Sequence, residues 1–175
     1  MTKETALSEN SSAFFYEKHK DVLEQVDQLN DVLTNLRYEG KVHVGRNMND
    51  IEKVLIFFSK ELLPHVKLDE MVFAFVEKHI PKLESVVRLL QAEHKEMVVN
   101  IEVFSFLFRE LEHEKNESKR VEAIEKLRDK GTYLVYLLRN HIQAESEIVY
   151  KIIDRELRPE EKKTLFKLVK ELKAE

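Results

Sequence analysis

The chain has 175 residues, a formal net charge of −4 and no cysteine. Its 43% hydrophobic and 35% charged residues, with only three glycines and three prolines, are typical of one helical domain and exclude collagen-like, low-complexity and loop-rich β chains. The negative charge gives no general attraction to nucleic acid or anionic lipid, so neither is expected as a partner. Without cysteine, thiolate zinc sites and cysteine catalysis are excluded. Any metal site must use histidine and carboxylate ligands.

The first half of the chain predicts a polar leader and two long helices. Residues 1–12 are polar and aperiodic, which predicts a flexible leader. They contain no apolar targeting segment, and no later run reaches the ~20 residues of a membrane span, so we expect a cytoplasmic protein. Apolar residues at three- and four-residue steps predict a helix from about residue 13 to Tyr38. A connection over 40–49 and a second helix over 50–79 follow.

The second half predicts two more long helices and a short one. Pro81 separates the second helix from a third, which ends in the charged run 110–119. Ser118 is the expected cap of a fourth helix to Leu157, in which Gly131 is a potential weak point. Pro159 starts a short fifth helix. The predicted fold is an all-α, up-down-up-down four-helix bundle over 13–157, with the C-terminal helix, 158–175, packed on it.

One histidine lies in the middle of the apolar stripe of each long predicted helix. A single core-facing histidine would most simply be an ordinary hydrogen-bonded residue. Here, however, His65 precedes the turn at Ile80 by about 15 residues and His94 follows Pro81 by about 13, so a rise of about 1.5 Å per residue puts both at one height. His94 and His141 agree in the same way, whereas His19 and His65 differ by about 6 Å, which a long connection can absorb. The four side chains are therefore predicted to share a site: His19, His65, His94 and His141.

Two carboxylates accompany these histidines. Asp69 and Glu145 each follow a histidine by four residues, which places the acid and the imidazole on one helix face. Burying the two acids uncompensated would cost several kcal/mol, and the inner stripes carry no lysine or arginine to pair with them. The sequence therefore predicts bound cations, and imidazole with carboxylate suits iron, manganese or zinc.

The number of donors favours two ions. If Asp69 and Glu145 both bridge, each metal receives about two imidazoles, two carboxylate oxygens and a bridging oxo or hydroxo group. One position of each octahedron then stays open for a small ligand. The Glu-x-x-His pattern of ferritin-like di-iron proteins occurs here only at Glu110–His113, in the charged end of the third helix, so that type of site is excluded.

These residues resemble the hemerythrin-like, or HHE cation-binding, family. The resemblance spans about 13–157 and is carried by four segments: His19, Leu62–Glu70 (LLPHVKLDE), Glu93-His94 and His141–Glu145 (HIQAE). It implies a non-haem di-iron centre and roles in oxygen or redox sensing, iron handling or defence against nitrosative and oxidative stress. Oxygen-carrying members have two histidines one turn apart on the third helix and an acid five residues after the last histidine. This chain differs at both points, which argues against simple oxygen carriage.

Three further residues are candidates near the site. Glu70 lies about 140° from the face of His65 on an ideal helix, so we expect Asp69 to bridge and Glu70 to be a terminal ligand or a partner behind the ligands. A bend at Pro64 could reverse that order. His43, in the predicted 40–49 connection, is a candidate fifth imidazole. Tyr16 is either a hydrogen-bond donor behind the ligands or a core residue.

Three functional hypotheses follow. The preferred one is a non-catalytic or weakly redox-active di-iron protein that binds dioxygen, nitric oxide or peroxide for sensing, iron handling or protection. The alternative is a di-iron oxidoreductase that turns over peroxide, nitric oxide or ferrous iron. A metal-free interaction bundle is the third, and the inward-facing acids argue against it. The sequence does not identify the redox partner.

Overall fold

The computed structural model describes residues 13–38 and 44–172, in which helices are joined by short turns. The predicted leader and His43 lie outside these residues. In chain order the elements are α1 (Ala13–Tyr38), α2 (Val44–Phe57), the π-helical turn η2 (Phe58–Leu62), α3 (Leu63–His79), the 3₁₀ turn η3 (Pro81–Leu83), α4 (Glu84–His113), α5 (Glu117–Ala144), the π-helical turn η4 (Glu145–Tyr150), α6 (Lys151–Glu156) and α7 (Pro159–Leu172).

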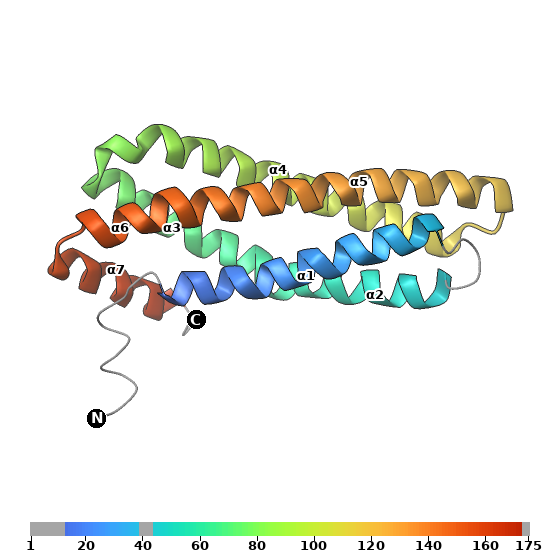
Figure 1. Ribbon diagram of the computed structural model, residues 1–175, viewed down its shortest axis with the longest axis horizontal. Coiled ribbons are helices and arrows are strands. Elements are labelled where there is room, and N and C mark those ends of the chain that lie inside the picture. The colour runs from blue at the N-terminus through green and yellow to red at the C-terminus, as the bar shows by residue number, and fades with distance from the viewer. Residues whose placement is uncertain (1–12, 39–43, 173–175) are drawn as a thin grey trace, which may run out of the picture.

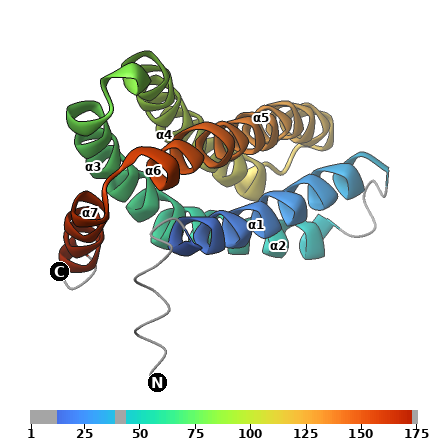
Figure 2. The same ribbon diagram turned by 60° about the vertical axis from the view of Figure 1, so that its left-hand side comes forward.

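The described elements join into four long rods that pack as a bundle, as Figure 1 illustrates. The α2, η2 and α3 segments run on as one rod, and α5, η4 and α6 as another. The α1 helix packs against α2 and α5, and α4 packs against α5 and α3. The short α7 helix lies beside α3 at one end of the bundle (Figure 2). This arrangement confirms the predicted all-α four-helix bundle with a short C-terminal helix. Within the described ranges, no helix is both long enough and apolar enough to cross a membrane.

Two predicted helix boundaries are wrong. The second helix begins at Val44 rather than at 50, because Met48 and Ile51 extend its apolar face onto the core and helix formation tolerates Gly45. The fourth long helix is capped by Asn116 rather than Ser118. The Asn116 side chain accepts a hydrogen bond of 3.1 Å from the backbone amide of Lys119. This is the usual bond of an N-cap residue, whose side chain accepts from the amide three positions later.

Both rods that carry a histidine–acid pair contain a π-helical turn next to that pair. The η2 turn ends at Leu62, three residues before His65, and η4 begins at Glu145 itself. Pro64 has no amide proton for a bond to the Lys60 carbonyl, so a wider turn there costs less than it would elsewhere. Turns of this kind shift the register of the side chains that follow, and they are frequent at functional sites.

The interior is divided into two hydrophobic clusters with a polar layer between them. The first cluster joins α1, α2, α4 and α5, and the second lies around α3, η4, α6 and α7. Each long rod passes from one cluster to the other: α1, for example, has Phe15 in the second, His19 in the polar layer and Val22 in the first. The antiparallel helices thus bring their histidines to one level, as the arithmetic of helix rise predicts.

Gly131 is a close-packing position rather than a weak point in α5. A Cβ atom there would lie 2.6 Å from Leu33 Cδ1 and 2.9 Å from Phe104 Cε2, whereas a Cβ at the exposed Gly45 would meet nothing within 4 Å. Overpacking costs about 1–3 kcal/mol and alanine restores about 1 kcal/mol of helix propensity, so we expect Gly131→Ala to destabilise the protein by about 1 kcal/mol. Gly45→Ala should be neutral or stabilising. Equal urea midpoints for the two variants would contradict this packing argument.

Candidate metal centre

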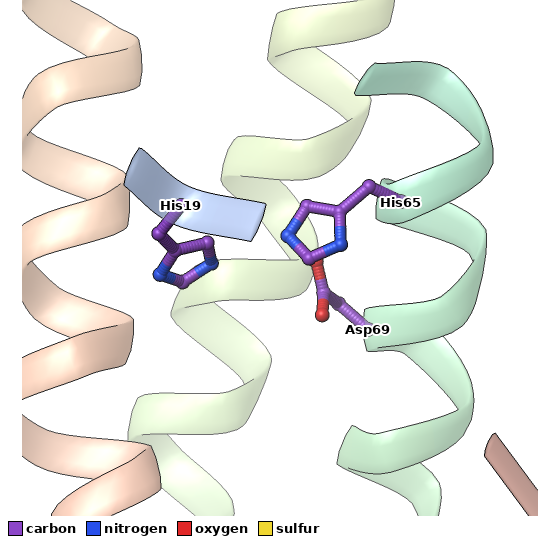
Figure 3. Close-up of side chains that lie close together, drawn as sticks. All are labelled: His19, His65 and Asp69. Atoms are coloured by element: carbon purple, nitrogen blue, oxygen red, sulfur yellow. The ribbon is translucent and has the colours of Figure 1, made fainter. Parts of the chain in front are cut away.

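The polar layer consists of six buried side chains from four rods. All are at most 9% exposed: His19, His65, Asp69, His94, His141 and Glu145. Figure 3 shows His19 reaching from α1 toward His65 and Asp69 of α3. All six line one cavity of about 10 Å³, closed on its other sides by apolar residues such as Leu62, Met97 and Leu138. The structure thus brings together the six residues that the sequence pattern selects as metal ligands.

The six side chains form two groups of three, each with ligand atoms within 4.8 Å of one another. We name them position A (His19, His65 and Asp69) and position B (His94, His141 and Glu145). Each offers two imidazoles and one carboxylate, a donor set suited to iron, manganese or zinc. Among the described residues these are the groups with metal-binding geometry.

Glu145 lies between the two positions. Its Oε2 atom is 3.0 Å from His19 Nε2 in position A and 3.5 Å from His141 Nε2 in position B. Asp69 Oδ2 lies 3.3 Å from His65 Nε2, and Asp69 Oδ1 accepts a hydrogen bond of 3.1 Å from Tyr150. A carboxylate that touches donors of both groups can link two ions.

Polar groups behind the imidazoles orient the rings of His19, His94 and His141. His94 Nδ1 lies 2.7 Å from Glu70 Oε1, and His141 Nδ1 lies 2.8 Å from Glu93 Oε2, so each ring donates its Nδ1 proton to a carboxylate. His19 Nδ1 lies 2.9 Å from the Ser146 hydroxyl. These contacts turn each Nε2 toward the cavity, the arrangement common in metal-binding histidines. In the sequence Glu93 appears only as part of the Glu93-His94 segment of the family resemblance, and Ser146 is not indicated except by its position next to Glu145.

Burial shifts the pKa values of several of these side chains toward their uncharged forms. Burial lowers the pKa of His19 to about 4 and that of His141 to about 2, so both imidazoles keep a free lone pair near neutral pH. Burial, reinforced by Glu93 and Glu70, raises the pKa of Glu145 to about 8. Burial and the nearby Glu145 also raise the pKa of Asp69 well above its usual range.

Several atoms of the centre are buried without a hydrogen bond. They are Nε2 of His19, His94 and His141, Oδ2 of Asp69 and Oε1 of Glu145. Buried polar atoms normally have partners, and a group of lone pairs around one cavity is what a cation would satisfy. The residues therefore fit a bound metal on the geometry of this chain alone.

Glu70 and Tyr16 lie behind the centre, and the other described histidines, His79 and His113, lie away from it. Glu70 is 39% exposed at its side chain and contacts His94 and Gln91. Tyr16 donates a hydrogen bond of 3.1 Å to the carbonyl of Ser146, one step removed from His19. His79 contacts the Phe75 carbonyl near the end of α3 and belongs to neither position, and His113 is exposed at the end of α4.

The fold and the site define a helical-bundle protein with a histidine–carboxylate metal centre. The family model of the hemerythrin HHE cation-binding domain matches residues 10–153, and the chain belongs to this family. A search of curated proteins found no match to this chain. The resemblance read from four sequence segments is therefore confirmed across the bundle.

Proposed function

We propose that the protein is a cytoplasmic, non-haem di-iron protein that binds dioxygen, nitric oxide or peroxide for sensing, iron handling or stress protection. The observation that carries the proposal is the pair of buried three-residue groups with Glu145 in contact with both. Bound iron would supply a redox-active position that coordinates a small ligand. The chain itself supplies lone pairs, two carboxylates and a closed apolar surrounding.

A surface pocket next to position A supports the entry of small ligands to the centre from that side. The pocket has a volume of about 440 Å³ and is lined by Phe14, Lys18, Glu61, Pro64, His65, Lys67 and Leu68. His65 also lines the inner cavity, so this residue borders both spaces. The inner cavity, about 10 Å³, has room for about one water-sized molecule. A space this small excludes large substrates from the interior of the centre.

The metal stoichiometry tests the di-iron part of the proposal. Protein reconstituted anaerobically with excess ferrous iron should retain two ions per chain, and Glu145→Gln should retain fewer because it alters a carboxylate near both positions. Asp69→Asn should lose about one ion, while Glu70→Gln should keep two. One tightly held ion or none in the unaltered protein would refute the proposal.

Optical spectra test the ligand part. The oxidised protein should absorb in the near ultraviolet, and nitric oxide added to the reduced protein should change its spectrum reversibly. A featureless spectrum at full iron loading would contradict a bridged pair. Sustained turnover of peroxide or nitric oxide with a reductant would show that the protein is an oxidoreductase instead.

A further inference from the structure

The outer side of α4 carries a stripe of exposed apolar side chains. Four large hydrophobic residues of this helix are 38–60% exposed: Leu89, Val99, Val103 and Phe106. Together with the exposed Ala92 and Glu96, they recur at alternating steps of three and four residues from 89 to 106. This is the spacing with which one helix packs lengthwise along another, and the stripe spans about 25 Å of α4.

The stripe adjoins exposed aromatic residues of α5. Tyr133 is 40% and Tyr136 66% exposed, and the Tyr133 hydroxyl donates a hydrogen bond to the Glu96 carboxylate. Since α4 and α5 lie side by side (Figure 1), the two tyrosines and the stripe form one surface, which we name the α4–α5 face. Exposed apolar area gathered on one face, with aromatic residues in it, is typical of a protein interface.

We propose that the α4–α5 face binds a second copy of this chain, with the two α4 helices antiparallel about a two-fold axis. In such a pair, residues equally far from the axis on either side meet. An axis through the middle of the stripe brings Leu89 to Phe106 of the partner subunit, and Ala92 to Val103 of the partner subunit. The apolar stripe is therefore complementary to itself, as a symmetric interface requires.

The charges beside the stripe are also self-complementary. Lys95 and Glu102 are exposed and lie seven residues apart, so they share one flank of the stripe. The same axis places Lys95 of each copy close to Glu102 of the other, which makes two pairs of opposite charge. Such pairs fix the register and orientation of two partners. A flank that carries both signs favours a copy of itself over a strongly basic or strongly acidic partner.

Two features that would oppose this pairing are offset within each chain. Glu96 lies in the stripe, but its carboxylate accepts the hydrogen bond from Tyr133. Arg88 approaches Arg109 of the partner subunit at each end of the interface, where Glu84 lies 2.5 Å from the Arg88 guanidinium. Both arginines are exposed, so solvent and salt screen their repulsion.

Sedimentation velocity of the full chain over a micromolar concentration series tests the proposal. We expect reversible formation of a dimer with twice the 20.8 kDa mass of the chain. Val103→Glu should weaken dimerisation at least about 10-fold because it buries a charge against an apolar residue. Ile148→Glu is the matched control, since Ile148 is equally exposed at 38% but lies in η4, outside the α4–α5 face. A chain that stays monomeric, or equal effects of the two variants, would overturn the proposal.

Charge reversal tests the pairing of Lys95 with Glu102. Lys95→Glu alone or Glu102→Lys alone brings like charges together twice in the symmetric dimer, so each should weaken dimerisation about 10-fold. A mixture of the two variants can form a dimer in which both contacts join opposite charges, so association should return. A mixture that associates no more tightly than either variant by itself would refute this pairing.

Cysteine cross-linking tests the orientation, because the chain has no cysteine of its own. In the antiparallel pair the two copies of residue 99 lie near the axis, whereas the two copies of residue 89 lie about 25 Å apart along the helices. A short bismaleimide should therefore join two Val99→Cys chains and should not join two Leu89→Cys chains. Efficient cross-linking through residue 89 would overturn the antiparallel arrangement.

Discussion

Loading the centre with iron should raise the melting temperature by about 8–16 °C. A ligand at 1,000 times its dissociation constant that binds only the folded state adds about 4 kcal/mol, and each kcal/mol moves the midpoint of a protein this size by about 2–4 °C. His141→Ala should remove most of this metal-dependent increment because it deletes a donor of position B. Calorimetric scans of metal-free and loaded protein measure the increment directly.

His79→Ala is the control for the melting experiment. His79 bonds to the Phe75 carbonyl and stacks on the Phe75 ring with centroids 4.0 Å apart, but it belongs to neither metal position. Its replacement can lower both melting temperatures by a few degrees, yet the difference between loaded and metal-free protein should persist. If His79→Ala and His141→Ala reduced the increment equally, the assignment of inner and outer histidines would be wrong.

Metal binding should release protons, and the affinity should rise about tenfold per pH unit between pH 6 and 7.5. In the metal-free fold the pKa of Glu145 is raised to about 8, so the acid is protonated below that pH and must lose its proton to bind a cation. His19 and His141, with pKa values lowered to about 4 and about 2, are already neutral and contribute no protons. The affinity therefore increases with pH until Glu145 is ionised.

Zinc titrations in buffers of different ionisation enthalpy count the released protons. We expect at least one proton per chain at pH 6.5, with a further contribution from Asp69, whose pKa is also raised. Glu145→Gln has no such proton, so its remaining zinc binding should release correspondingly fewer. Binding that is independent of both buffer and pH would show that the two acids are ionised before the metal arrives.

The sequence determined which six candidate ligands face the core, because helical periodicity relates chain position directly to helix face. His65 and Asp69, like His141 and Glu145, share a face through their four-residue spacing, and constant helix rise puts His94 level with His65. Few glycines and prolines made long helices the expected elements. The all-α fold, the height of the site along the bundle and the six buried residues therefore follow from helix spacing and helix rise.

Helix ends were less predictable from local rules. Asn116 and Ser118 are both good cap residues, and the choice between them depends on the turn that joins α4 to α5. Val44–Asn49 carries Gly45 and two asparagines, typical of a connection, yet it is helical because Met48 packs on the core. Packing against neighbouring helices outweighed the local preference there.

Only the tertiary structure decided what lies behind the ligands and how tightly the helices pack. Glu93 is 48 residues from His141, Tyr150 is 81 from Asp69 and Ser146 is 127 from His19, so no helical spacing relates these partners. Likewise, the sequence marks Gly131 as a weak point of its helix, whereas the structure shows that Leu33 and Phe104 pack too closely there for a larger side chain. The periodicity of one helix fixes which face a residue occupies, whereas its partner across the bundle depends on the rotation and register of the neighbouring helices, which packing alone sets.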